Sequence, residues 1–110
     1  MTDNEKAAIA AGLWEPEACP EHQRGAPTDC YATEPAPDMH DPANLWRALE
    51  NLRQRGIRTR VEADLEQPLW GCEFRTVPDD EQIGEVGLAR SVANAVFAAL
   101  VALYDAEHPA

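Results

Sequence analysis

"IRTRVEADLEQPLWGCEFRT", residues 57–76, contains two segments in which apolar or small side chains alternate with polar ones, separated by a polar stretch with a proline. Alternation with a period of two is typical of strands that bury one face. We therefore predict a β-hairpin with strands over residues 57–63 and 69–76. The rest of the chain is interpreted outward from this hairpin.

The polar face of the hairpin predicts ion pairs within the chain. When both apolar faces lie on the same side, Glu73 lies across from Arg58 or Arg60, and such a cross-strand pair contributes about 0.2–1 kcal/mol. This part of the sequence contains five arginines: Arg47, Arg53, Arg55, Arg58 and Arg60. Because carboxylates such as Glu50 lie near them, we expect internal ion pairs rather than contacts with nucleic-acid phosphates.

The segment "HDPANLWRALENLRQRG", residues 40–56, has clear signals for both ends of a helix. Asp41 is typical of an N-cap, and Gly56 is typical of a C-terminal stop. Pro42 suits the first helical position, because its missing N–H is not needed there. We predict a helix over residues 42–55, with an apolar stripe made of Leu45, Leu49 and Leu52.

The stretch "PDDEQIGEVGLARSVANAVFAALVALYDAE", residues 78–107, is predicted to form one long helix over residues 80–105. Asp79 or Asp80 is expected as the N-cap, with Gln82 completing a capping box and the acids of the first turn favoured by the helix dipole. This helix would be apolar over more than half of its circumference. We therefore expect either the N-terminal segment or a second copy of the protein to cover it.

The N-terminal segment is expected to hold a short helix that begins after Thr2, Asp3 or Asn4 and ends near Gly12. Residues 15–41 are rich in proline and lack apolar periodicity, which predicts an irregular segment. A chain of 110 residues has the length of one domain. We predict a single α+β domain, with a small antiparallel hairpin or sheet packed against helices.

Charge narrows the classes of partner. Nine Lys and Arg against 20 Asp and Glu give a formal net charge of −11. Such a charge repels the nucleic-acid backbone and attracts a basic protein surface. The acids fall mainly in residues 1–42 and 62–85, on either side of a basic stretch over residues 43–61. We expect no direct binding of nucleic acid and favour a basic nucleic-acid-binding protein as partner.

Cysteine content and hydropathy indicate the cellular compartment of the protein. Three cysteines, an odd number, argue against a secreted disulfide framework, and we identify no basic-then-apolar leader. The apolar run over residues 93–104 is shorter than the ~20 residues that a membrane span needs. We therefore expect a protein of the host bacterium's cytoplasm, without membrane association, as a monomer or weak homodimer.

Two phrases flank the hairpin, "PDMHDPANLWRALENL" (residues 37–52) and "GLARSVANAVFAALVALY" (residues 87–104). With the hairpin's aromatic second strand, this pattern over residues 37–105 resembles the phage ABA-sandwich domain family. The resemblance implies a phage origin and transfers no catalytic residues. By analogy, small acidic phage proteins without enzymatic motifs include anti-CRISPR inhibitors, some of which resemble DNA in charge and occupy the DNA path of a host surveillance complex.

Carboxylates are the candidate partner-binding residues. If the first strand continues, Glu62, Asp64 and Glu66 form a row with about 6.6 Å between neighbours, a spacing comparable with that of successive phosphates. Acids of the following turn and helix start would thicken this row. The full candidate set is Glu62, Asp64, Glu66, Asp79, Asp80, Glu81 and Glu85. The structural alternative is a polar hairpin tip and an ordinary acidic helix N-terminus.

Other chemistry has weaker signals. Four zinc-ligand residues lie in the Pro-rich region: Cys19, His22, Cys30 and His40. Their spacing fits no zinc pattern, so we favour a loose polar segment and expect no metal or other cofactor. Cys72 alternates with Trp70 and Phe74 and is predicted to be a small buried hydrophobe. We recognise no nucleophile with a base and no Gly-rich phosphate loop, so we expect no enzyme.

These observations favour function through protein binding. The first hypothesis is a phage or mobile-element inhibitor that acts as a DNA mimic in the nucleic-acid groove of a CRISPR surveillance complex and blocks target DNA binding. The second is a phage accessory or structural protein that self-associates through its C-terminal helix. A small metal-binding module is a third.

Overall fold

The computed structural model describes residues 1–15, 35–64 and 66–109. Its elements in chain order are α1 (Asp3–Ala10), α3 (Pro42–Gln54), β1 (Ile57–Ala63), β2 (Trp70–Thr76), β3 (Gln82–Ala89) and α4 (Val92–Glu107). The predicted α+β class is therefore confirmed. The irregular segment predicted over residues 15–41 lies largely outside the described residues, and its described part, residues 15 and 35–41, contains no helix or strand.

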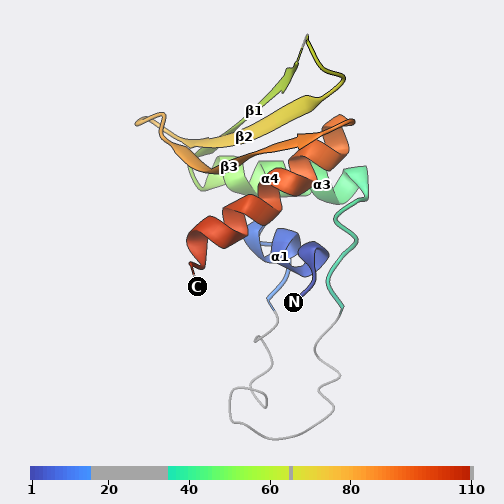
Figure 1. Cartoon of the computed structure of the whole chain (residues 1–110). Coiled ribbons are helices and arrows are strands. Elements are labelled where there is room, and N and C mark those ends of the chain that lie inside the picture. The colour runs from blue at the N-terminus through green and yellow to red at the C-terminus, as the bar shows by residue number, and fades with distance from the viewer. Residues whose placement is uncertain (16–34, 65, 110) are drawn as a thin grey trace, which may run out of the picture.

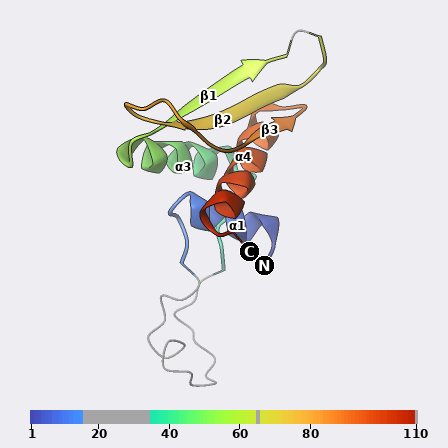
Figure 2. The same ribbon diagram turned by 60° about the vertical axis from the view of Figure 1, so that its left-hand side comes forward.

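Three layers make up the molecule, as Figure 1 shows. The first layer is an antiparallel sheet with the strand order β1-β2-β3. Helices α3 and α4 cover one face of this sheet, and α1 packs against α4 on the side away from the sheet, an arrangement visible in both Figure 1 and Figure 2. No helix of the described residues covers the other face, which is called the open face below.

The local signals for α3, β1 and β2 are confirmed. The Asp41 side chain accepts a hydrogen bond from the Ala43 N–H at the start of α3. Gly56 follows the helix with a φ of 81°, a value that favours glycine. β1 and β2 pair with Arg60 opposite Glu73, so the ion-pair register expected from the apolar alternation is also confirmed.

The prediction of one long helix over residues 80–105 is wrong in its first part. Residues 82–89 form the strand β3 instead. α4 begins only after Ser91, whose side chain accepts a hydrogen bond from the Asn94 N–H. Asp80, expected near the N-cap of that helix, lies in the turn between β2 and β3 with a φ of 56°.

Close packing of β3 on α4 explains why this segment is a strand. A Cβ at Gly87 would lie 2.4 Å from the Ala95 carbonyl oxygen, and one at Gly84 would lie 3.1 Å from the Ala102 carbonyl oxygen. The two glycines therefore let the β3 backbone approach the helix backbone. Inside a helix, each would instead cost about 1 kcal/mol relative to alanine.

α1 confirms the short N-terminal helix. Thr2 is its N-cap, and Glu5 completes a capping box. The helix buries Ala7 and Ala8 completely and packs on α4. Of the two expected covers for the apolar surface of α4, the structure therefore supplies the N-terminal segment.

The core lies between the sheet and the helices. Its largest fully buried side chains are Phe74, Met39, Leu52, Leu100, Leu103 and Cys72. The predicted burial of Cys72 and Phe74 is confirmed, whereas Trp70, the first residue of β2, is 37% exposed. Within the described part of the chain, no helix has the length and hydropathy to cross a membrane.

Candidate protein-binding surfaces

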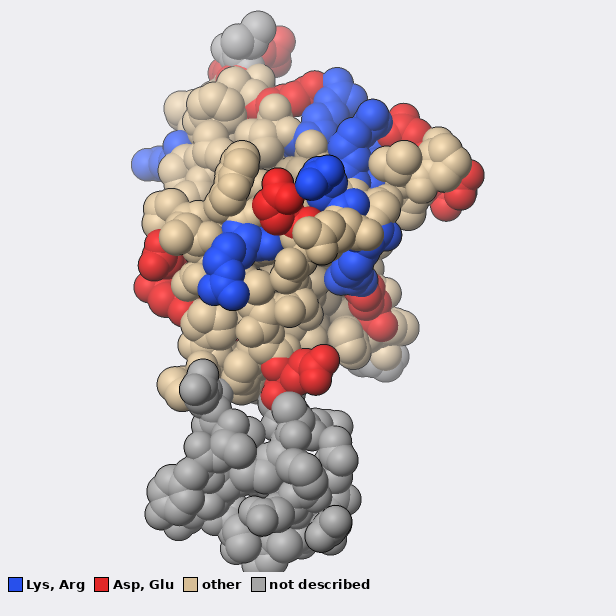
Figure 3. All heavy atoms as spheres, turned by 180° about the vertical axis from the view of Figure 1, so that it is seen from behind, with Lys and Arg blue, Asp and Glu red and all other residues tan. Residues whose placement is uncertain are grey.

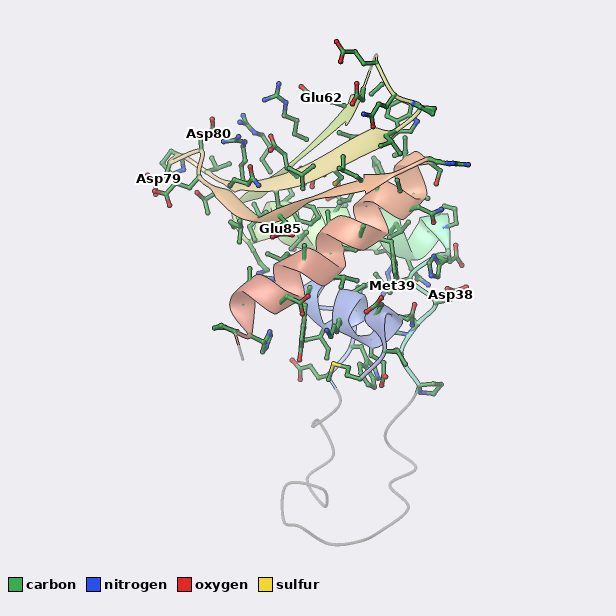
Figure 4. The ribbon with its side chains drawn as sticks, in the orientation of Figure 1. Asp38, Met39, Glu62, Asp79, Asp80 and Glu85 are labelled. Atoms are coloured by element: carbon green, nitrogen blue, oxygen red, sulfur yellow. The ribbon has the colours of Figure 1, made fainter. Side chains whose placement is uncertain are left out.

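The predicted carboxylates lie at opposite ends of the sheet. Glu62 lies near the turn between β1 and β2, whereas Asp79 and Asp80 lie in the turn between β2 and β3, as Figure 4 shows. The seven residues of β2 separate the two turns by about 20 Å. These carboxylates therefore do not form one continuous row.

The row is also shorter at the hairpin end than expected. β1 ends at Ala63, so strand spacing does not reach Glu66. Instead, the Asp64 carboxylate accepts a hydrogen bond from the Glu66 N–H at 2.9 Å, which is a local turn contact. Likewise, Glu81 and Glu85 do not belong to a helix N-terminus. Residues 82–89 form β3, and α4 begins twelve residues later than predicted.

Arginines neutralise part of the acidic set on the open face. Glu62 pairs with Arg60 on the same strand, and Asp80 pairs with Arg58. Glu73 accepts a hydrogen bond from Arg75 at 2.9 Å. Figure 3 shows basic side chains gathered together on one side of the molecule, with acidic ones beside them. The expectation of internal ion pairing is confirmed for Arg53, Arg55, Arg58 and Arg60.

Tertiary structure brings an acid of α4 close to Glu85 of β3. Glu85 of β3 and Asp105 of α4 line the same shallow pocket of about 350 Å³, together with Gly84, because β3 lies directly on α4. We define the acidic end as Asp79, Asp80, Glu81, Glu85 and Asp105. The sequence interpretation missed Asp105, because only the packing of β3 on α4 brings it near residues 20 or more positions earlier.

The acidic end is only partly neutralised. Asp105 pairs with Lys6 at 3.1 Å, and Asp80 pairs with Arg58. Among the described residues, Asp79, Glu81 and Glu85 have no cationic side chain within 4.0 Å, and all three are exposed. This surface therefore offers negative charge to a partner without first breaking an internal ion pair.

A second candidate surface is apolar. A cleft of about 520 Å³ lies between α3 and β1 and is called the α3–β1 cleft below. Its lining includes Trp46 and Leu49 of α3, Ile57 and Thr59 of β1, and Val77. Trp46 is 68% exposed and Val77 is 56% exposed. Exposed large apolar side chains that share a concave surface are typical of a binding site.

Cys72, in the central strand of the sheet, is not a candidate for a catalytic or binding residue. Cys72 is completely buried, and this burial, with a smaller contribution from Glu73, raises the pKa of its thiol to about 12. A thiol with this pKa stays protonated and is a poor nucleophile. The prediction of a buried hydrophobe therefore agrees with its chemistry.

Most of the metal hypothesis lies outside the described residues, because Cys19, His22 and Cys30 belong to the part of the chain that is not described. The remaining candidate, His40, stacks on Phe97 with 4.1 Å between ring centroids. Over residues 1–15, 35–64 and 66–109, no group of three or more potential ligand side chains is placed to hold a metal ion.

Comparison with known proteins found no matching family model, no similar curated protein and no similar solved structure. The resemblance to the phage ABA-sandwich domain family therefore stays a prediction.

Proposed function

We propose that this protein is a non-enzymatic inhibitor that binds the cationic, nucleic-acid-binding groove of another protein through its acidic end. The observation that carries the proposal is a set of exposed carboxylates that have no cationic partner among the described residues: Asp79, Glu81 and Glu85. Arg and Lys side chains that bind phosphates also bind carboxylates through charge-assisted hydrogen bonds. A groove built for a nucleic-acid strand can therefore accept this surface.

Net charge supports the same class of partner. At −11, the chain is repelled by nucleic acid and attracted to a basic protein, and this attraction accelerates the encounter. The proposal is narrower than the sequence hypothesis, because it moves the contact from a row along the hairpin to one end of the molecule. A bacterial CRISPR surveillance complex is the partner that the phage analogy suggests, and support for that identity is by analogy alone.

Self-association through the C-terminal helix receives less support. α4 faces the sheet on one side and α1 on the other, and Val92 is its one exposed large hydrophobic side chain. The apolar surface on which that function depends is therefore covered within the chain itself. Protein binding through the acidic end, in contrast, uses side chains that are already exposed.

Displacement of DNA tests the proposal. Increasing concentrations of the protein are added to a purified CRISPR surveillance complex bound to labelled target DNA, at low and at high salt. We expect displacement at low salt that weakens as salt rises, because exposed charges are screened. The double variant Glu81→Lys/Glu85→Lys should require at least about tenfold more protein for the same displacement.

The matched control carries the same change of charge away from the acidic end, as Glu15→Lys/Glu66→Lys. Both positions are exposed. This control should displace DNA almost as well as the unmodified chain. Failure of the unmodified protein to displace DNA, or equal losses in the two double variants, would contradict the proposal.

A further inference from the structure

The free edge of β1 has an arrangement that the proposed function does not use. The sheet order β1-β2-β3 leaves the outer side of β1 without a strand partner in the described residues. The Gly56 carbonyl accepts a hydrogen bond from the Val77 N–H, and the Asp64 N–H donates one to the Leu69 carbonyl, each at 2.9 Å. Gly56 and Asp64 therefore point toward β2. Inward and outward backbone groups alternate along an antiparallel strand. The N–H and C=O groups of Ile57, Thr59 and Val61 therefore point to the open edge.

The side chains of this edge form a self-complementary row of charge on the open face of the sheet. At alternate positions, the row consists of Arg58, Arg60 and Glu62 of β1 and of Asp64 directly after it, all of them exposed. Two cations are thus followed by two anions. When the row is reversed end to end, each cation meets an anion. An antiparallel second copy presents the row in that reversed order. Within one chain Arg58 pairs with Asp80 and Arg60 pairs with Glu62, so contacts with a second copy would exchange these partners.

We propose that β1 pairs with β1 of a second copy of this protein, antiparallel and with the two-fold axis at Val61. The two three-stranded sheets then become one continuous sheet. In this register Arg60 lies opposite Glu62 of the second copy, and Arg58 lies opposite Asp64 of the second copy. Each contact occurs twice by symmetry. Opposite charges directly across antiparallel strands stabilise their pairing.

Backbone geometry agrees with this register. The two Val61 residues face each other with their outward N–H and C=O groups, and Thr59 faces the outward groups of residue 63 of the second copy. The outward groups of Thr59, Val61 and residue 63 therefore each meet an outward group of the partner. Pairing also removes the exposed edge, whose free backbone groups otherwise remain available to other chains.

The charges discriminate against neighbouring registers. With the axis at Arg60, that arginine would lie opposite its own symmetry mate. With the axis at Thr59, Arg58 would lie opposite Arg60 of the second copy. Like charges directly across two strands are destabilising. Of these three registers, the one centred on Val61 places every charge of the row opposite its complement.

The same register covers the α3–β1 cleft. The end of the second copy's β1 lies beside Thr59, and Thr59 and Ile57 line the cleft. Trp46 lies on the opposite wall and is largely exposed in the single chain. The end of the second strand therefore lies close to this apolar surface, and removal of apolar surface from water favours association.

Charge exchange tests the proposal on the purified full chain. Sedimentation equilibrium over a range of protein concentrations and salt should show a monomer–dimer equilibrium that shifts toward monomer as salt rises. Arg58→Asp and Asp64→Arg each place like charges opposite one another twice. Each should raise the dimer dissociation constant at least about tenfold. The double variant Arg58→Asp/Asp64→Arg restores opposite charges and should restore dimerisation.

Arg90→Asp is the matched control, because it makes the same change of charge directly after β3, at the other edge of the sheet. It should leave the dissociation constant within about twofold of the unmodified value. Circular dichroism verifies that each variant remains folded. A monomer at all concentrations would overturn the proposal, as would a dimer in which the double variant is weaker than both single variants.

A cross-link tests the register itself in a Cys19→Ser/Cys30→Ser background, where Cys72 is buried. Cα atoms of a directly opposed, hydrogen-bonded antiparallel pair lie about 5.5 Å apart, within the range of a disulfide. Val61→Cys should form an intermolecular disulfide on mild oxidation. Thr59→Cys should not, because the two Thr59 residues lie four positions apart in this register. A disulfide in the Thr59→Cys variant and none in the Val61→Cys variant would refute the axis at Val61.

These measurements use no nucleic-acid-binding partner. Their failure therefore leaves the proposed inhibition untouched, and failure of DNA displacement leaves dimerisation untouched. The substituted positions also differ, because Glu81 and Glu85 do not belong to the β1 edge, although Asp80 of the acidic end pairs with Arg58 of that edge.

Discussion

Cys72 lies in the central strand, between Val61 of β1 and Gly87 of β3. Its apolar surroundings disfavour the thiolate and raise the pKa of the thiol to about 12. An unfolded cysteine has a pKa of about 8.5. The folded state therefore holds the Cys72 proton over a range of pH in which the unfolded state has lost it.

Alkaline pH should expose this difference. Below the unfolded pKa both states are protonated, and the contribution of the thiol to stability is fully present. As pH rises from about 9 toward 12, the unfolded state gains a thiolate that the folded state resists, so the free energy of unfolding falls by up to about 1.4 kcal/mol per pH unit. Urea titrations at several pH values should show a shallower decline in Cys72→Ala. Equal slopes in the two proteins would contradict the burial of a protonated thiol.

At the scale of secondary structure elements, β3 depends on contact between two backbones. Asp79, Asp80 and Glu81 directly before it imitate the first turn of a helix, and this similarity misled the prediction of a helix over residues 80–105. Gly87 is the decisive residue, because β3 contacts α4 there without an intervening side chain. A close approach of this kind is a property of two elements and not of either one alone.

Gly87→Ala should therefore be strongly destabilising. Its Cβ would lie 2.4 Å from both the Ala95 carbonyl oxygen and the Ala99 nitrogen, which are backbone atoms that cannot rotate away. We expect the free energy of unfolding, measured with urea, to fall by about 3 kcal/mol. Gly71→Ala is the control, because the nearest atom to its Cβ would be 3.5 Å away. It should cost less than about 1 kcal/mol, and equal losses would contradict the packing argument.

At the scale of the whole molecule, α1 completes the core by covering the side of α4 that the sheet does not reach. Two further contacts anchor this layer. Lys6 pairs with Asp105 at 3.1 Å, and the Asn51 side chain of α3 donates a hydrogen bond to the Ala11 carbonyl at 3.1 Å. α1 therefore joins the far layer to both other helices, and its removal should expose apolar surface of α4.

Ala8→Arg should detach α1, because Ala8 is completely buried and has no room for a charged side chain. We expect a loss of about 3 kcal/mol in the free energy of unfolding. Binding of an apolar dye should rise as the α4 surface becomes exposed. Asp3→Arg introduces the same side chain at an exposed position of the same helix and should bind no additional dye. Equal dye binding by both variants would show that α1 does not cover α4.

The sequence by itself determined the features that act over a few residues. Asp41 and Gly56 set the ends of α3, since capping involves neighbouring backbone groups. The alternation over residues 57–76 set the register of β1 and β2, since a slip by one residue would turn the apolar face outward. The row of charge along β1 is also legible in sequence.

Only the tertiary structure decided the identity of β3, the cover of α4 and the composition of the acidic end. Each depends on residues far apart in the chain, such as Glu85 beside Asp105 and Gly87 against Ala95. The physical reason is that local pattern measures what one segment prefers, whereas close packing and electrostatic proximity depend on which distant segment lies against it. The predicted carboxylates are separated for the same reason, because they lie in turns at opposite ends of β2.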